Sequence, residues 1–368
     1  NRDNLLKLDS SVTHTWTLDG PGVGSLTRGN SPVMNFAGMT GLEGGSGRDD
    51  FILRNPDASI VDIHGGGGTN SLSVIWEIDT SLVWTIADAV GSLSDQNNLH
   101  YVKKFEHIQE LTGQSGVDRF LISGKTQLDF IISGAGDDEV SLSDTATLKH
   151  LNTGEGSDTI TISDGALIEG LIEAGAGIDH LDLSHYDNPV VWEIADNKIG
   201  NFQYTDLEKF TAPQGKENSV QGPHSVNKWT ITGTNSGTLQ VGNGTPLDFS
   251  GINQLRGGDQ TDTFVLAGGK ITAINVVKGL IDGGGGDNFL QGNDGVNEWI
   301  VNGSNSGQLR NDEQGGVEAF ENIQNLIGGA NSDDFVLRGQ GVLMGWIQGG
   351  EGDDSVKFEK ALAVWLAD

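Results

Sequence analysis

The sequence predicts an all-β protein, a right-handed parallel β-solenoid with about 20–21 residues per coil, and three observations lead to this prediction. Glycine makes up 56 of the 368 residues, about twice its usual share. A glycine turn that ends in an acidic or amide residue recurs along the chain, and a short apolar strand follows it. In the middle of the chain these turns have equivalent glycines at a regular spacing of 20, 20 and 21 residues: Gly116, Gly136, Gly156 and Gly177.

Two short strands fit within each such period, for example residues 119–122 and 128–133. At about 3.3 Å per residue, each strand is roughly 13–20 Å long. Because stacked coils lie about 4.8 Å apart, equivalent side chains form ladders. We therefore expect inward stacks that form the core: Phe51 with Leu72, and Phe120 with Val140, Ile160 and Leu181.

A longer unit begins with a tryptophan strand and a glycine turn, as in WTLDGPGVGSL and WTITGTNSGTL. Its five starts are Trp16, Trp84, Trp192, Trp229 and Trp299. Trp229 and Trp299 follow Asn227 and Asn297 at the spacing by which Phe51 follows Asp49, so we expect the opening tryptophans in the core. An array of exposed tryptophans that stacks on sugars is the alternative.

An aromatic residue and two apolar residues at intervals of three follow each tryptophan strand, as in Phe105, Ile108 and Leu111. This spacing also fits one helical turn. Seven residues beside glycines are too few for a stable isolated helix. We expect an extended corner or one short 3₁₀ turn.

Composition excludes several classes of protein. The chain has 51 acidic and 21 basic residues, a net charge of −30, which argues against nucleic acid as a partner. It has no cysteine, which excludes disulfides, thiolate metal sites and a cysteine nucleophile. No stretch approaches the about 18 consecutive apolar residues of a transmembrane helix, so we expect no transmembrane segment.

The repeats divide the chain into three parts. Residues 1–210 and 229–368 are each predicted to be repetitive β-solenoid, and one continuous stack is the alternative. Residues 211–228, with Pro213, Pro223 and His224, break the pattern and are predicted to be a junction or loop. The chain ends in a further tryptophan motif around Trp365, so we interpret it as a segment of a longer repetitive protein.

The glycine turns fit the nonapeptide GGxGxDxUx, in which U is a large apolar residue. The copies GGSGRDDFI from Gly44 and GGEGDDSVK from Gly349 match every specified position. This motif resembles that of haemolysin-type (RTX) calcium-binding repeat proteins, and the long tryptophan unit looks like those of giant repetitive bacterial surface adhesins. In that family the motifs run back to back, whereas here they return every 20–21 residues, so calcium is expected along one edge at most.

The resemblance implies calcium as the cofactor, bound by the sixth-position side chain and by carbonyl groups of the turn. Carried over by position, the candidate metal ligands are Asp49, Asn70, Asp118, Asp138, Asp158, Asp179, Asp262, Asp287, Asp333 and Asp354. The alternative is a turn without metal, in which each acid bonds nearby backbone groups. An unneutralised ladder of carboxylates would repel itself, which favours the metal.

The expected function is a structural or adhesive repeat segment of a secreted bacterial surface protein, stabilised by calcium and located outside the cell. Its partners would be calcium ions and surface glycans or other cells, as in a biofilm. We expect no catalytic residues, because the paired acids recur with the repeat and neighbouring residues on a strand face opposite ways. A glycan-binding module and a polysaccharide-acting β-helix enzyme remain as alternatives.

Overall fold

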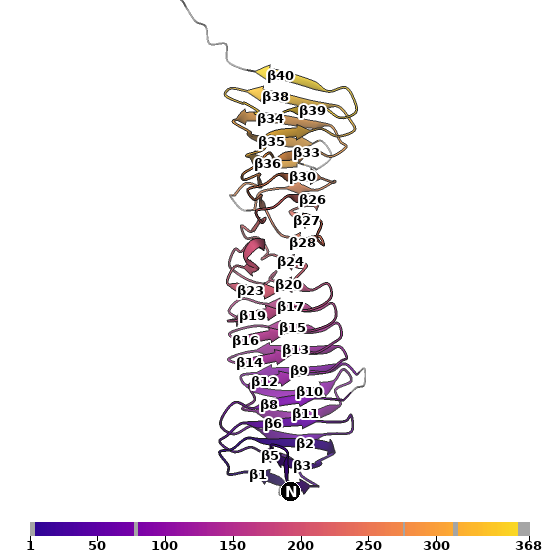
Figure 1. Cartoon of the computed structure of the whole chain (residues 1–368), viewed down its shortest axis with the longest axis vertical. Helices are drawn as coiled ribbons and strands as arrows, with labels where there is room; N and C mark the ends of the chain where they lie inside the picture. Colours follow the sequence, from indigo (N-terminus) through magenta and orange to yellow (C-terminus); the bar gives the residue numbers. More distant parts are fainter. Residues whose placement is uncertain (1–3, 77–79, 275–276, 312–315, 360–368) are drawn as a thin grey trace, which may run out of the picture. The chain divides into compact units, whose positions relative to one another are not determined.

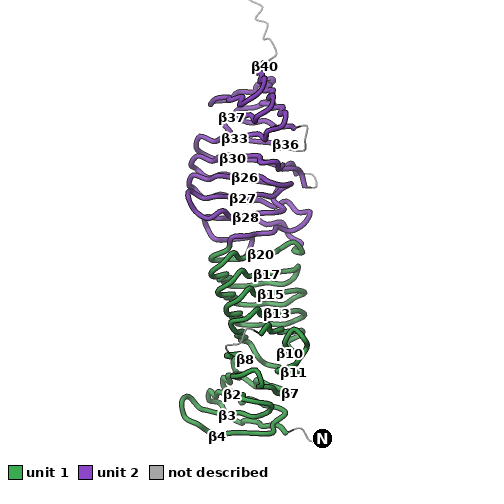
Figure 2. The backbone as a smooth tube through the Cα atoms, turned by 90° about the vertical axis from the view of Figure 1, so that its right-hand side faces the viewer, with its two compact units in different colours: residues 1–186, 202–207 green, residues 187–201, 208–368 purple. Residues whose placement is uncertain are grey.

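The computed structural model describes residues 4–76, 80–274, 277–311 and 316–359. The described chain is all-β, and its strands run mainly in parallel from coil to coil, as the repeats predict (Figure 1). It forms two compact units, of residues 1–186 with 202–207 and of residues 187–201 with 208–368 (Figure 2). No described helix is long and apolar enough to span a bilayer.

Unit 1 contains two sheets. The first holds β1 (Leu5–Lys7), β5 (Gly41–Glu43), β7 (Ile60–His64), β11 (His100–Glu106), β10 (Val90–Asp95), β9 (Leu82–Ala87), β13 (Asp118–Ser123), β15 (Glu139–Leu142), β17 (Thr159–Ile162) and β20 (His180–Asp182). The second holds β4 (Ser31–Phe36), β3 (Val23–Arg28), β2 (His14–Gly20), β6 (Asp49–Leu53), β8 (Ser71–Val74), β12 (Glu110–Thr112), β14 (Gln127–Ile132), β16 (Thr147–Asn152), β18 (Leu167–Ile168), β19 (Leu171–Glu173) and β23 (Phe202–Thr205).

Unit 2 also has strands in two sheets. One holds β24 (Lys209–Thr211), β28 (Leu247–Ser250), β27 (Ser236–Val241), β26 (Asn227–Gly233), β30 (Asp262–Leu266), β33 (Phe289–Gln291), β37 (Asn325–Ile327) and β39 (Ile347–Gln348). The other holds β22 (Lys198–Ile199), β21 (Val191–Glu193), β25 (Ser219–Gln221), β29 (Gln254–Arg256), β31 (Lys270–Ile271), β32 (Leu280–Asp282), β36 (Gly316–Glu321), β35 (Ser306–Asn311), β34 (Asn297–Gly303), β38 (Asp333–Arg338) and β40 (Ser355–Glu359). A 3₁₀ turn, η1 (Ile194–Asp196), follows β21.

The predicted inward stacks are confirmed. Phe51 pairs with Leu72 between β6 and β8. Phe120, Val140, Ile160 and Leu181 pair in sequence through β13, β15, β17 and β20, and all are fully buried. Alternation along each strand directs these residues inward, and the parallel register aligns them between coils.

The five tryptophan strands each form an antiparallel hairpin with the strand that follows, at β2–β3, β9–β10, β21–β22, β26–β27 and β34–β35. All five tryptophans are fully buried, which confirms the core assignment and is incompatible with an exposed sugar-stacking array of these residues. Trp16 stacks on Phe51 of the next coil, with ring centroids 5.6 Å apart.

A third strand completes four of the hairpins, and its aromatic residue lies opposite a glycine in the middle strand. Phe105 pairs with Gly91 in this way, and a Cβ atom at Gly91 would lie 2.1 Å from the Phe105 ring. The chain then turns into the next sheet, where Leu111 is buried in β12. The aromatic signature is therefore an extended corner, as predicted.

Residues 211–228, expected to form a junction or loop, lie in unit 2. They contain β25, which pairs in parallel with β21 and β29. Asn218 of this stretch is fully buried and donates from its side-chain amide to the carbonyl groups of Pro213 and Gly251. The stretch thus contributes one strand of the parallel sheet despite its prolines.

Candidate functional site

The sixth-position side chains of the glycine turns point into the interior of each unit, at or immediately before the start of a strand. Eight of the ten candidate ligands are buried: Asp49, Asn70, Asp118, Asp138, Asp158, Asp179, Asp262 and Asp333. Asp354, in the last described coil, is exposed. Asp287 is exposed because it lies one residue before the interior position, which Asn288 occupies.

The correction from Asp287 to Asn288 follows from the strand register. Thr263 pairs with Phe289, so Asp262 is level with Asn288. The backbone N–H of Asp262 also donates to Oδ1 of Asn288 at 2.9 Å. In the sequence GGGGDNFL the interior residue is therefore the asparagine, as it is for Asn70 in GGGGTNSL.

Hydrogen bonds join these side chains to the neighbouring coil. The backbone N–H of Asp118 donates to Oδ1 of Asp138 at 2.7 Å, that of Asp138 donates to Asp158 at 2.7 Å, and that of Asp158 donates to Asp179 at 2.8 Å. The same bond joins Asp49 to Asn70 and Asp333 to Asp354, both at 2.9 Å. We call this series the Asx ladder. The ladder provides acceptors for backbone N–H groups that strand pairing leaves without a partner at the beginning of a strand.

The second oxygen of several ladder acids accepts a bond from its own turn. The donor is the backbone N–H four residues earlier: Gly45 for Asp49, Gln114 for Asp118, Gly258 for Asp262 and Gly329 for Asp333, at 2.7–2.8 Å. Where the residue is asparagine, its NH₂ group instead donates to turn carbonyls, as Asn288 does to Gly285 at 2.9 Å. In these turns an inward N–H group thus accompanies aspartate at Asp49, Asp118, Asp262 and Asp333, and an inward carbonyl group accompanies asparagine at Asn288.

Two tryptophan indoles also bond to ladder acids. The Nε1–H of Trp16 donates to Asp49 at 3.0 Å, and that of Trp229 donates to Asp262 at 3.2 Å. In Asp49 and Asp262 both carboxylate oxygens therefore accept hydrogen bonds inside the core. The sequence analysis did not anticipate this link between the two repeats, although a fixed spacing of 33 residues separates the partners in both pairs.

Asp118, Asp138 and Asp158 differ from these acids, because each has one buried carboxylate oxygen without a hydrogen bond. We call these three residues the central column. The Ser133 hydroxyl near Asp138 donates instead to the Thr153 carbonyl at 2.8 Å. Burial raises the pKa of Asp118 to about 8 and that of Asp138 to about 7, and it also raises the pKa of Asp158. Repulsion from the next acid adds to the rise for Asp118 and Asp138.

The arrangement differs from a calcium site of the kind that the resemblance implies. The turn carbonyls of Gln114, Gly134 and Gly154 accept N–H groups of the next turn, at 2.8–3.2 Å, so they point along the stack. Within the described ranges, no group of three or more His, Cys, Asp or Glu side chains is placed to hold a metal ion. The unbonded oxygens of the central column are carboxylate oxygens, a ligand type that calcium accepts.

Sequence reasoning missed one further asparagine of the Asx ladder and two glutamines that extend it. Oδ1 of Asn218 accepts the N–H of Val190 at 3.0 Å, and the glutamines Gln109 and Gln324 accept the N–H groups of Asn70 and Asn288 at 2.8 Å. The signal that identifies Asn218 is an Asn or Asp two residues before an inward apolar residue. The glutamines lack that signal, because they reach the ladder from a corner rather than from a glycine turn.

Comparison with protein-family models finds no match, and comparison with curated proteins finds no significant match. The resemblance to RTX repeats therefore depends on the nonapeptide motif alone.

Proposed function

We propose that this chain is a structural repeat segment of a secreted bacterial surface protein, which holds adhesive parts of that protein away from the cell. The Asx ladder is the observation that carries this proposal. Asn70, Asp138, Asp158, Asp179 and Asp354 each accept a backbone N–H from the neighbouring coil, so along these runs one coil helps to complete the hydrogen bonding of the next. A repeat of this kind extends a stack by adding identical layers.

Calcium stabilisation is the second part of the proposal, and we assign it to the central column. Asp118, Asp138 and Asp158 each offer an unbonded carboxylate oxygen in the interior. Calcium bound there would neutralise carboxylates that burial disfavours in their charged form. Asp49 and Asp262 are weaker candidates, because N–H groups already occupy both oxygens of each side chain.

An extracellular location agrees with the composition. The chain has no cysteine and a net charge of −30. In a cytosol poor in calcium, repulsion between carboxylates would oppose folding, and millimolar calcium outside the cell would relieve it.

Thermal unfolding with calcium or with a chelator tests the calcium part. Ions that bind only the folded chain add about 2.7 kcal/mol per site at a hundredfold excess over Kd, so the melting temperature should rise with calcium. A variant with Asn at Asp118, Asp138 and Asp158 should lose this rise, and the exposed Asp353→Asn control should keep it. If the melting temperature is the same with calcium and with chelator, the chain is a structural repeat that folds without metal. Binding of chain-coated beads to bacterial cells tests the adhesive part.

A further inference from the structure

The outer face of one sheet of unit 2 carries a column of side chains that runs from coil to coil. β30, β33, β37 and β39 pair in parallel, and Figure 2 shows the first three in this order. In β30, β33 and β37 the residue before the column is fully buried, so the column itself points outward. Its members are Val265, Gln291, Ile327 and Gln348.

An aromatic pair lies beside this column. Phe289 comes two residues before Gln291, and Trp346 comes two residues before Gln348, so each ring is on the same face as its glutamine and about 7 Å from it along the strand. The ring centroids of Phe289 and Trp346 are 5.7 Å apart, with an interplanar angle of 70°. Trp346 is 47% exposed, whereas every other tryptophan in the described part of the chain is buried.

Asn325 fixes the position of Trp346. Its side chain is fully buried, and its Oδ1 accepts the backbone N–H of Trp346 at 3.2 Å. Its Nδ2 donates to Oδ1 of Asp287 at 2.6 Å, which holds the amide in place. Because the backbone is held by Asn325 and the indole contacts Phe289, a ligand that packs on the indole orders little that is not already ordered.

Two hollows adjoin the column, and Gln291 and Asp294 line both of them. Their volumes are about 590 and about 330 Å³, and Ile327 and Gln348 also line the smaller one. All the lining residues belong to the described part of the chain. Asp294 and Glu351 are acidic and no lining residue is basic, so this surface is unfavourable for an anionic ligand.

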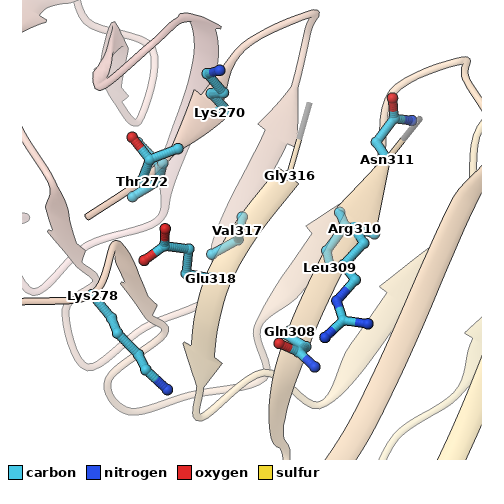
Figure 3. Close-up of a pocket in the computed structure, with 11 residues that line it drawn as sticks. Lys270, Thr272, Lys278, Gln308, Leu309, Arg310, Asn311, Gly316, Val317 and Glu318 are labelled. Atoms are coloured by element: carbon cyan, nitrogen blue, oxygen red, sulfur yellow. The ribbon is translucent and has the colours of Figure 1, made fainter. Parts of the chain in front are cut away.

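A separate hollow opens between β31, β35 and β36, where Figure 3 shows Lys270, Glu318 and Arg310. Residues 275–276 and 312–315, which adjoin its lining residues in the sequence, are outside the described part of the chain. We therefore assign no ligand to this hollow.

We propose that the outer face formed by Phe289, Gln291, Trp346 and Gln348 binds an uncharged β-linked glucan chain. The hydroxyl groups of a β-linked glucose ring are equatorial, which leaves flat C–H faces that pack on aromatic rings. Neither glutamine side chain bonds to another described residue, and each amide can both donate to and accept from sugar hydroxyls. The site is separate from the Asx ladder and does not depend on calcium. It also differs from sugar stacking on the five repeat tryptophans, which are buried.

Isothermal titration of the full chain with cellotetraose tests the proposal, with tetragalacturonic acid as the charged control of equal length. We expect the glucan to bind and the acid not to bind. Trp346→Ala should weaken binding at least about tenfold, and Trp346→Phe should weaken it less, because an aromatic face is kept. Phe358→Ala is the matched control and should have no effect, because Phe358 is equally an exposed aromatic residue but lies in β40 of the other sheet.

The double variant Gln291→Ala with Gln348→Ala provides an independent test that leaves both rings in place. It should weaken binding at least about fivefold, because bonds to the sugar hydroxyls are lost. Thermal unfolding of each variant shows whether it is folded. Absence of cellotetraose binding at about 10 mM, or unchanged affinity in folded Trp346→Ala and in the double glutamine variant, would overturn the proposal. Equally tight binding of tetragalacturonic acid would overturn the assignment to an uncharged sugar.

Discussion

The backbone N–H of Asp118 donates a 2.7 Å hydrogen bond to Oδ1 of Asp138, which lies 20 residues further along the chain. The N–H of Asp138 makes the same bond to Asp158. Asp138 is thus the acceptor for one neighbouring coil and the donor to the other. One of its carboxylate oxygens takes part in the ladder, and the surroundings of the second oxygen decide what a substitution does.

Replacing the ladder side chain of Asp138 with alanine should destabilise the fold. Asp138→Ala leaves the buried N–H of Asp118 without an acceptor, which costs about 1–3 kcal/mol. Asp354→Ala should cost less, because Asp354 is exposed and water can replace its bond to Asp333. Urea unfolding measures both. If Asp138 binds calcium, the destabilisation by Asp138→Ala should be smaller in chelator than in calcium. If Asp138 acts only through the ladder, the destabilisation should be the same in chelator and in calcium.

Asparagine should have opposite effects at Asp138 and Asp49. In Asp138→Asn, the amide oxygen can keep the ladder bond and the NH₂ group takes the place of the unbonded oxygen. Without calcium we expect stability at pH 8 to be unchanged or increased. In Asp49→Asn, the NH₂ group would face either the N–H of Gly45 or the indole N–H of Trp16, which should cost about 1–3 kcal/mol. Equal effects at the two positions would contradict this account of their second oxygens.

Stability without calcium should fall as pH rises from about 4 to 8. Asp118 and Asp138 have folded-state pKa values of about 8 and about 7, above the unfolded value of 3.8. Between these values the folded chain binds more protons than the unfolded chain, so raising the pH favours unfolding, by at most about 1.4 kcal/mol per pH unit for each group. The loss should level off above the folded pKa values.

Urea midpoints measured from pH 4 to 9 in chelator test this dependence. Asp138→Asn should make the slope shallower, since one titrating group is removed. Asp334→Asn is a suitable control, because the Ser355 hydroxyl and Lys357 lower the pKa of Asp334 and its effect lies below pH 4. A flat profile for the unsubstituted chain would contradict the prediction.

Gly91→Ala should strongly destabilise unit 1. The new Cβ would lie 2.1 Å from the Phe105 ring, and a clash of this kind in a packed core typically costs about 1–3 kcal/mol. Gly20→Ala in β2 is the control, because its new Cβ would lie 3.8 Å from the Cβ of Val23, an ordinary contact distance. In thermal unfolding, the double variant Gly91→Ala with Phe105→Leu should regain part of the melting temperature that Gly91→Ala loses. A neutral Gly91→Ala would mean that the ring has room to move.

Local sequence patterns are sufficient to predict the coil and its core. The spacing of Gly116, Gly136, Gly156 and Gly177 sets the length of the repeat, and alternation within each strand directs Phe120, Val140, Ile160 and Leu181 inward. The antiparallel pairing of the tryptophan strands appears only in the structure, whereas the burial of the five tryptophans and the extended corners are also predicted from the sequence. These features depend on local periodicity, which can be recognised without knowledge of distant contacts.

The contacts of the sixth-position residues depend on packing between coils, which local patterns do not specify. The motif identifies Asp49 and Asp138 alike, but Trp16 bonds to the first, and the second keeps an unbonded oxygen. That difference arises from partners in other coils and from the direction of the turn N–H groups, which the motif does not encode. The register gap at Glu318, which no residue of β31 or β32 faces, likewise appears only when both strands pair with β36.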